Sequence, residues 1–455
     1  DPSIVRDGED FYLTYTSYDK VPGLKIWHSK NLLDWNPVGY AIDRYMGSVW
    51  APEFIKHDDL FYIYFPTSDG KNFVVTAKDP RGPWSEPVPI DVQAIDPGHI
   101  ATPEGARYVY FNGGLFAPLA GDGLSVTKPV EKRYDGWPYP GDWIAECFCL
   151  ESPKLMYRKG WYYLTSAQGG TAGPATSHMV ASARARSPGG PWEDSPYNPV
   201  VHTWSDEETF WSKGHGTVFD DADGNWWVIY HGYRKGHLAW GRHVLLEAVE
   251  WTDDGWFRTV RDPKREGVIR NFQNENVRSD YFSGGRLDLQ WQITGADTST
   301  DFYELDGDEI VLKGAPDSVR TLHINPDEKA FEVTVEFAQS PPRGVEAGLA
   351  MYYSAEMFSG VGILDGKARR LGLGRSHPEQ GLEELRPRHL RIRVVKDVVT
   401  SWASEDGENW HKLDRSYELS GYQHNVLGGF SWIRPAIVVK GDGEVRVKNF
   451  TYKPL

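Results

Sequence analysis

Five stretches of this chain share one pattern, in which a polar turn leads into an aromatic-rich segment. The first aromatic residues of these segments are Phe11, Phe61, Tyr108, Trp161 and Trp226. The repeat is therefore 47 to 65 residues long. Short strands separated by Gly/Asp turns at a weak period of this length are typical of a β-propeller. The five repeats predict a five-bladed β-propeller over residues 1–270.

About ten residues before each aromatic segment lies a short apolar run that carries a polar residue. The runs are Asp1–Val5, Trp50–Phe54, Asp96–Ile100, Glu151–Leu155 and His215–Phe219. Because the innermost strand of every blade lines the propeller axis, residues at matching places in the runs converge on one space. Several carboxyl groups in one cavity repel one another and acquire different pKa values, as acid–base catalysis requires. The pattern predicts an active site at the axis.

Composition narrows the classes of partner. The formal net charge is −15, which argues against nucleic acid or an anionic membrane surface and disfavours a polyanionic glycan. The chain contains no run of 18 apolar residues, so no transmembrane helix is predicted. Aromatic residues make up 14% of the chain, which suits both β-structure and stacking against sugars. The oligomeric state is left open.

The cysteines and the first residue give little information about the compartment. Cys147 and Cys149 are one residue apart, so on a strand they would share a face and would not readily form a disulfide. The chain has no Cys/His spacing of a zinc site. A secreted or periplasmic location is favoured. We also expect residues to precede Asp1 in the native protein, because an N-terminal ammonium group would lie beside a candidate base.

The pattern changes after about residue 260. A polar linker is predicted over 271–279, followed by short alternating strands such as 331–337, 390–395 and 445–452. Residues 404–410 are predicted to form a hairpin turn. Helical periodicity is nearly absent and turn signals are frequent, so residues 280–455 are predicted to form an antiparallel β-sandwich. This domain is interpreted as a structural cap, with carbohydrate binding as the alternative.

Several motifs in residues 1–260 resemble glycoside hydrolase family 43, the family of β-xylosidases and α-L-arabinofuranosidases. The motifs are DPSIVRDGEDFYL, PGL with HSKNLLDW, WAPEF, AIDPGHI, ESPKLMYRKGWYYLTSAQGGT, and GHGTVF followed by GNWWVIYHG. They occur in the order of the family, and the sandwich region resembles the domain often appended to it. The resemblance implies the same all-β fold, a five-bladed propeller followed by a sandwich.

The resemblance also implies roles for three carboxyl groups. Asp1 matches the general base that activates water, Glu151 matches the general acid, and Asp96 matches a third carboxylate that holds the acid and raises its pKa. The implied stereochemistry is inversion, in which base and acid stand about 6.5–9.5 Å apart. Read without the resemblance, Asp1 and Asp96 could be turn residues and Glu151 a surface residue.

Glu146 is the rival acid, because it begins a Glu-Cys pair of the kind found in fructan-cleaving propellers. Glu146 lies 15 residues before Trp161, whereas Glu151 lies 10 before it. Asp1 also lies 10 residues before Phe11, so the shared register favours Glu151. The Asn-Asp-Pro-Asn element of the fructan family is missing.

The resemblance implies further site residues. His215 matches a central histidine associated with a structural calcium ion largely through water; the alternative is a hydrogen-bonded histidine in the axial channel. Trp50 matches a wall of the sugar pocket, with core packing as the alternative. Arg242 matches an arginine directed at sugar hydroxyls, and His178 follows a segment that could reach the pocket. Glu53 stands where many relatives carry aspartate and is left out of the catalytic set.

The expected activity is that of an exo-acting inverting glycosidase that removes a terminal pentose from a plant-type glycan. The sugar is α-L-arabinofuranose or β-D-xylose. The segments 171–178 and 204–211 favour arabinofuranose, because they would reshape the pocket rim. The alternatives are a non-catalytic sugar-binding propeller, which retention of all three carboxyl groups disfavours, and a fructan hydrolase.

Overall fold

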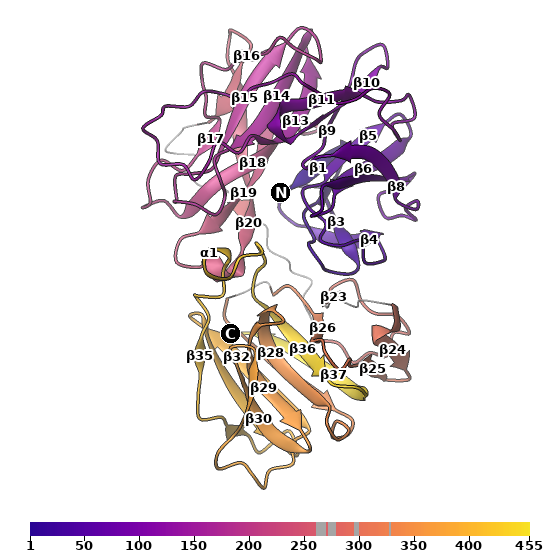
Figure 1. The fold of residues 1–455 in the computed structure, drawn as a ribbon, viewed down its shortest axis with the longest axis vertical. Coiled ribbons are helices and arrows are strands. Elements are labelled where there is room, and N and C mark those ends of the chain that lie inside the picture. The colour runs from indigo at the N-terminus through magenta and orange to yellow at the C-terminus, as the bar shows by residue number, and fades with distance from the viewer. Residues whose placement is uncertain (261–269, 272–278, 295–299, 327–328) are drawn as a thin grey trace. The chain divides into compact units, whose positions relative to one another are not determined.

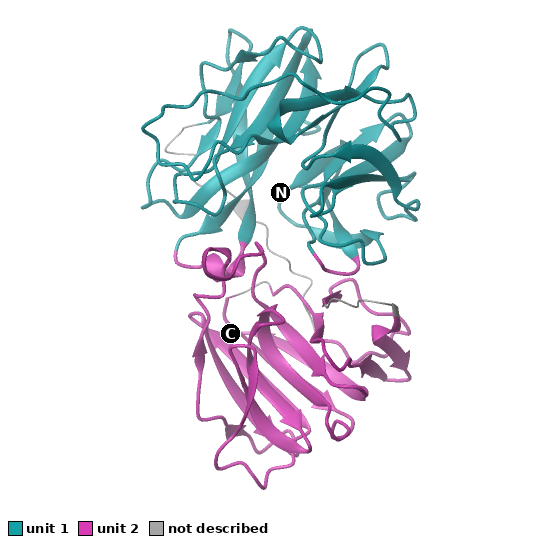
Figure 2. Cartoon of the chain, viewed as in Figure 1, with its two compact units in different colours: residues 1–18, 23–235, 242–273 teal, residues 19–22, 236–241, 274–455 magenta. Residues whose placement is uncertain are grey.

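A computed structural model describes residues 1–260, 270–271, 279–294, 300–326 and 329–455. The chain divides into two compact units, shown in Figure 2. The first comprises residues 1–18, 23–235 and 242–273, and the second comprises 19–22, 236–241 and 274–455. Most of the predicted linker 271–279 lies outside the described residues.

In the described residues, the first unit contains five antiparallel sheets that follow one another along the chain (Figure 1). The first blade is β1 (Ser3–Asp7), β2 (Asp10–Thr14), β3 (Gly23–Ser29) and β4 (Asn36–Ile42). The second is β5 (Glu53–His57), β6 (Leu60–Pro66), β7 (Lys71–Ala77) and β8 (Val88–Gln93). The third is β9 (Gly98–Ala101), β10 (Arg107–Phe111), β11 (Leu115–Pro118) and β12 (Glu131–Lys132). The fourth is β13 (Glu151–Arg158), β14 (Trp161–Gln168), β15 (Met179–Ala185) and β16 (Glu193–Asp194), with β17 (Val201–His202) beside β15. The fifth is β18 (Phe210–Asp220), β19 (Trp226–Arg234), β20 (Arg242–Trp251) and β21 (Phe257–Thr259), with β22 (Arg270–Asn271) beside β20.

The first strands of the blades form a closed ring. β1 contacts β5, β5 contacts β9, β9 contacts β13, β13 contacts β18, and β18 contacts β1. The predicted apolar runs form these first strands, and the aromatic segments form the second strand of every blade. The prediction of a five-bladed propeller with the apolar runs at its axis is confirmed.

The core of the propeller lies between neighbouring blades. One cluster joins the first and second blades through Tyr12, Leu24 and Phe61. Another joins the fifth blade back to the first through Ile229 and Ile4. The aromatic residues of the second strands therefore mostly pack between sheets. Their burial removes apolar surface from water, which stabilises the ring by about 25 cal/mol per Å².

The second unit is built from two antiparallel sheets. One sheet has the order β23 (Gln292–Thr294), β26 (Arg320–His323), β36 (Arg434–Lys440), β28 (Glu346–Ser354), β29 (Met357–Leu364), β30 (Lys367–Gly372) and β31 (Arg375–Pro378). The other has the order β24 (Tyr303–Asp306), β25 (Glu309–Lys313), β37 (Glu444–Pro454), β27 (Phe331–Phe337), β32 (His389–Val395), β33 (Val398–Ser404) and β34 (His411–Lys412), with β35 (Tyr417–Glu418) beside β33. A single apolar cluster draws on strands of both sheets, including Val333 and Leu349. The predicted sandwich is confirmed, and the predicted hairpin joins β33 to β34.

Helix is scarce in the described residues, as the sequence predicted. α1 (His424–Leu427) is one turn long, and the 3-10 segments are η1 (Asn112–Gly114), η2 (Leu238–Trp240) and η3 (Thr300–Phe302). The η2 segment belongs to the second unit, where the Trp240 indole nitrogen donates to Asp397 Oδ1 at 2.5 Å. Residues 19–22 also join that unit, because Val21 pairs with Ile293. Residues 19–22 and 236–241, which connect strands of the propeller blades, therefore belong to the second unit.

We predict that Gly98→Ala destabilises the propeller. A Cβ atom at Gly98 would lie 1.6 Å from the backbone oxygen of Pro153, so β9 and β13 would have to separate. Overpacking of this kind costs about 1–3 kcal/mol, and the melting temperature should fall by several degrees. Gly121→Ala is the matched control, because its Cβ would have no neighbour within 4 Å. Equal melting temperatures for the two variants would contradict the close approach of these strands.

Candidate active site

The polar residues at the starts of the first strands converge at the axis. Asp1 and Asp96 lie two residues before β1 and β9, Glu151 begins β13, and His215 lies within β18. The pairing registers of β13 and β18 shift next to Glu151 and His215, and such β-bulges redirect side chains near active sites. Asp96 has a φ of 56° and His215 a φ of 59°. The backbone therefore departs from regular strand geometry where the polar side chains meet.

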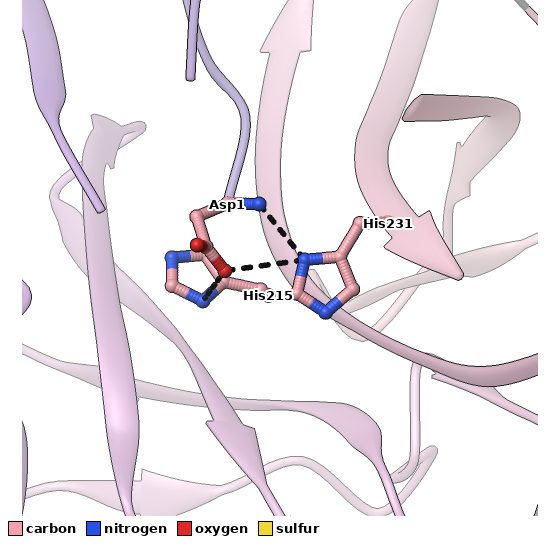
Figure 3. A group of neighbouring side chains, drawn as sticks. All are labelled: Asp1, His215 and His231. Carbon is pink, nitrogen blue, oxygen red and sulfur yellow. Dashed lines mark hydrogen bonds and ion pairs between the residues drawn. The ribbon is translucent and has the colours of Figure 1, made fainter. Parts of the chain in front are cut away.

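The Asp1 carboxylate is held by cationic and polar partners. Arg242 donates from Nη1 to Oδ1 at 2.8 Å and from Nη2 to Oδ2 at 2.9 Å. The Thr16 hydroxyl donates to Oδ2 at 2.5 Å. Figure 3 shows Asp1 between two imidazoles, with Oδ1 lying 3.2 Å from His215 Nδ1 and 3.3 Å from His231 Nδ1. A bidentate guanidinium stabilises the negative charge of a carboxylate, so Asp1 is equipped to stay ionised.

Asp96 is buried, and the half-buried Glu151 lies near it. The backbone nitrogen of Ser152 donates to Asp96 Oδ2 at 3.0 Å, which fixes Asp96 against the start of β13. Burial raises the pKa of Asp96 to about 6, against the opposing charge of Lys154. Burial, and then the charge of Asp96, raise the pKa of Glu151 to about 8. Glu151 is therefore protonated at neutral pH, as a general acid must be.

Two histidines lie against Asp1 and a third stacks on one of them, and all three are neutral near pH 7. Burial lowers the pKa of His215 and His231 well below the ordinary value and that of His178 to about 4. The His178 ring stacks on His231 with centroids 5.2 Å apart, and its Nδ1 lies 2.5 Å from the Gly169 oxygen. The structure therefore places His178 behind His231, on which its ring stacks.

Calcium fits these residues poorly. The possible ligand atoms of Asp1, His215 and His231 lie within 4.8 Å of one another. Two of them are nitrogens, and both Asp1 oxygens accept from Arg242, whereas calcium takes six to eight oxygen ligands. Among the described residues, nothing bonds to the buried Nε2 of His215, so this nitrogen is the one atom of the histidine that could meet water. The calcium ion stays a prediction, and no chemical step below depends on it.

The remaining predicted residues lie around this centre. Trp50 is half-buried, and its indole nitrogen donates to Ser48 Oγ at 2.9 Å. The segment of Trp50 and Ala51, which precedes β5, is tied to Asp1 through Thr16, whose hydroxyl accepts from the Ala51 nitrogen at 2.8 Å. The guanidinium of Arg242 contacts Asp1 and the Tyr18 hydroxyl, the latter at 2.5 Å. Arg242 therefore acts on the candidate base, and its contact with sugar hydroxyls stays a prediction.

Glu146, the rival acid, lies at an exposed position. Its carboxylate packs where a Cβ of Gly170 would be, and its charge is a minor cause of the raised pKa of Glu151. Glu151, by contrast, contacts the Asp96 region through Ser152. The geometry brings Glu151, and not Glu146, next to the third carboxyl group.

Four residues of this centre received no role from the sequence. They are Thr16, His231, Glu53 and Lys154. His231 lies in the sequence YHG at the end of the fifth aromatic segment. The signal that could have identified it is a polar residue near the end of an otherwise apolar second strand. Glu53 was noticed but left without a role, and its partner Lys154 lies in the ESPKL motif.

The expectation about the cysteines was wrong. Cys147 and Cys149 form a disulfide, with Cα atoms 5.3 Å apart. The expectation assumed a strand, but the described strands leave out residues 133–150, and Cys149 has a φ of 38°. A left-handed residue turns the two side chains toward each other, so the shared-face argument does not apply.

Comparison with known proteins identifies the family. The model of glycosyl hydrolases family 43 matches residues 1–257, and the model of the β-xylosidase C-terminal concanavalin A-like domain matches residues 279–434. The chain therefore belongs to glycosyl hydrolase family 43 and is a glycoside hydrolase, as its motifs predicted.

Individual relatives resemble the chain over different lengths. A non-reducing end α-L-arabinofuranosidase of Bacteroides ovatus is 32% identical over 64% of this chain and 58% of its own. A xylan 1,3-β-xylosidase of a Vibrio species is 29% identical over 94% of this chain and 88% of its own. The crystal structure of a family 43 protein of Bacillus licheniformis superposes with a TM-score of 0.86, at 24% identity over 100% of this chain and 98% of that one. This last similarity shows the fold.

We predict that Asp96→Asn shifts the basic limb of the pH profile of kcat/KM to lower pH. Glu151 must be protonated to act, so activity is lost as pH rises through its pKa of about 8. Removing the Asp96 charge lowers that pKa, while burial, the larger cause, keeps it above the ordinary value. The surface variant Asp10→Asn should leave this limb in place. An unshifted basic limb in Asp96→Asn would show that Asp96 does not tune the acid.

Proposed function

We propose that this chain is an exo-acting, inverting glycoside hydrolase that releases a terminal pentose from plant-type glycans such as xylan or arabinan. The observation that supports this most directly is the opposite surroundings of two carboxyl groups at one axis. Arg242 donates to both oxygens of Asp1, which favours the ionised form, whereas burial and the charge of Asp96 raise the pKa of Glu151 to about 8, which favours the protonated form. A glycosidase needs one carboxyl group in each state at the same pH.

In the proposed reaction, Asp1 accepts a proton from a water molecule while the water oxygen attacks the anomeric carbon. Glu151 donates its proton to the glycosidic oxygen as the bond from the anomeric carbon to that oxygen breaks. The products are the free sugar with inverted anomeric configuration and the shortened glycan, which carries a hydroxyl group where the glycosidic bond was. Arg242 and Thr16 hold the Asp1 carboxylate, with His215 and His231 beside it, and the Ser152 nitrogen holds Asp96.

The released sugar is proposed to be α-L-arabinofuranose or β-D-xylose. The names of the Bacteroides and Vibrio relatives include both activities. The segment 171–178, which favoured arabinofuranose at the level of sequence, lies at the site, because the Thr171 hydroxyl is 3.3 Å from His231 Nε2. Arabinofuranose is therefore the first candidate to test, and xylose the second.

A panel of aryl glycosides tests the activity and its stereochemistry. The panel contains an α-L-arabinofuranoside, a β-D-xyloside, a galactoside and fructan oligomers, and proton NMR follows the first anomer released. We expect hydrolysis of one or both pentosides with inversion. Release of a sugar with retained anomeric configuration would contradict the role of Asp1 as a base and would indicate a nucleophile instead. Cleavage of fructan alone would favour the fructan hydrolase, and binding without turnover would favour the sugar-binding propeller.

Leaving-group dependence separates the acid from the base. Glu151→Gln should lower kcat/KM on natural oligosaccharides by about 10²–10⁴-fold, and less on a nitrophenyl glycoside, whose leaving group needs little protonation. Asp1→Asn should lose activity on every leaving group, and azide should partly restore it. Glu146→Gln is the matched control. If Glu146→Gln is inactive and Glu151→Gln hydrolyses oligosaccharides normally, the assignment of the acid is wrong.

A further inference from the structure

A buried ammonium group lies at the propeller axis, close to the catalytic carboxyl groups. Lys154 stands three residues after Glu151 on β13, and its side chain is 3% exposed. Its Nζ donates to Glu53 Oε2 at 2.6 Å, to the Pro52 oxygen at 3.0 Å and to the Pro97 oxygen at 3.3 Å. The Glu53 side chain is 6% exposed. All three donors of the ammonium group therefore have acceptors in a buried place.

This ion pair joins the first strands of four blades. Lys154 belongs to the fourth blade, and its acceptors belong to the second and third. Glu53 also accepts from the Ser3 hydroxyl at 3.3 Å, in the first blade, and from the His99 nitrogen at 3.3 Å, in the third. Ser3 in turn accepts from the Phe54 nitrogen at 2.8 Å. Removing the ammonium group would leave these converging oxygens without a counter-charge.

The acceptors of Lys154 are ligands of the type that a hard cation takes. Two backbone carbonyl oxygens and one carboxylate converge on one point, and oxygen donors of this kind suit a group I or group II ion. Here the covalently attached ammonium group occupies that point. Beside the pair lies a cavity of about 120 Å³, lined in part by Ser3, Thr165 and Thr217. The oxygens that a central metal ion could use are thus already engaged.

The contact with Pro97 links the ammonium group to the catalytic residues. Pro97 directly follows Asp96, whose φ of 56° is uncommon for a residue with a side chain. Such a conformation is strained and persists only when its surroundings fix it. Lys154 fixes the carbonyl group of Pro97, the residue after Asp96, and the Ser152 nitrogen fixes the Asp96 carboxyl. Both anchors belong to β13, which also carries Glu151.

We propose that the Lys154 ammonium group, paired with Glu53, serves as the built-in axial cation of this propeller and positions Asp96 and Glu151 in place of a central metal ion. Lys154 is a positioning residue, because it contacts neither the water nor the glycosidic bond in the proposed reaction. The role in catalysis depends on the proposed function, whereas the role as the axial cation does not.

The first arm of the test uses the unmodified protein and needs no substrate. Melting curves are measured after exhaustive chelation with EDTA and after addition of calcium, and bound metal is checked by mass spectrometry. We expect the same melting temperature in both conditions and no stoichiometric metal. A metal-loaded protein that loses stability on chelation and regains it with calcium would overturn the proposal, whatever the protein hydrolyses.

The second arm compares Lys154→Met, Lys154→Arg and the control Lys213→Met. Methionine has similar length without charge, and Lys213 is another buried lysine of a first strand, paired with Glu208 at 2.7 Å. At a temperature well below melting, Lys154→Met should lower kcat on the order of tenfold to hundredfold with little change in KM, as small misplacements of catalytic groups do. Lys154→Arg should recover part of the loss, and Lys213→Met should keep the wild-type kcat.

A wild-type kcat in a folded Lys154→Met variant would overturn the positioning role. An equal loss in Lys213→Met would also overturn it, because any buried ion pair would then have the same effect. If Lys154→Met does not fold, Glu53→Gln replaces it, since this variant keeps the ammonium group and its carbonyl acceptors but weakens the pair. It should show the same selective loss of kcat.

Discussion

Burial of charge at the propeller axis is the constraint on which the rest of the site depends. The ring of first strands shields Asp96, Glu53 and Lys154 from water, and an isolated charge in such a place is costly. Each charged group there therefore has a specific partner. Asp1 is paired with Arg242, and Glu53 with Lys154. Glu151 has no cation of its own in the described contacts and takes up a proton instead.

The different protonation states of the carboxyl groups follow from these partners. A guanidinium on both oxygens keeps Asp1 ionised, and burial beside Asp96 raises the pKa of Glu151 to about 8. Neutral imidazoles next to Asp1 add hydrogen-bonding groups without adding charge. One fold thus provides a base and an acid at the same pH, and their difference arises from neighbours contributed by other blades.

The sequence was most informative where the chain repeats. Polar turns followed by aromatic segments predicted the blades, and the common register of the apolar runs brought Asp1, Asp96 and Glu151 to one axis. Contacts across blades could not be predicted, because they depend on bulges and left-handed residues that no local pattern reveals. The pairing of Lys154 with Glu53, 101 residues away, and the turn of Arg242 onto Asp1 are of this kind. The disulfide was missed for the same reason, since its segment is not a strand.

The central claim is that Glu151 carries a proton at neutral pH while Asp1 does not. The most direct measurement is a ¹³C NMR pH titration of the protein labelled at the glutamate side-chain carboxyl carbon, with the Glu151 resonance assigned by its absence in Glu151→Gln. The account predicts that this carboxyl group titrates near pH 8. Titration of the Glu151 resonance near pH 4.5, the ordinary value for glutamate, would contradict it.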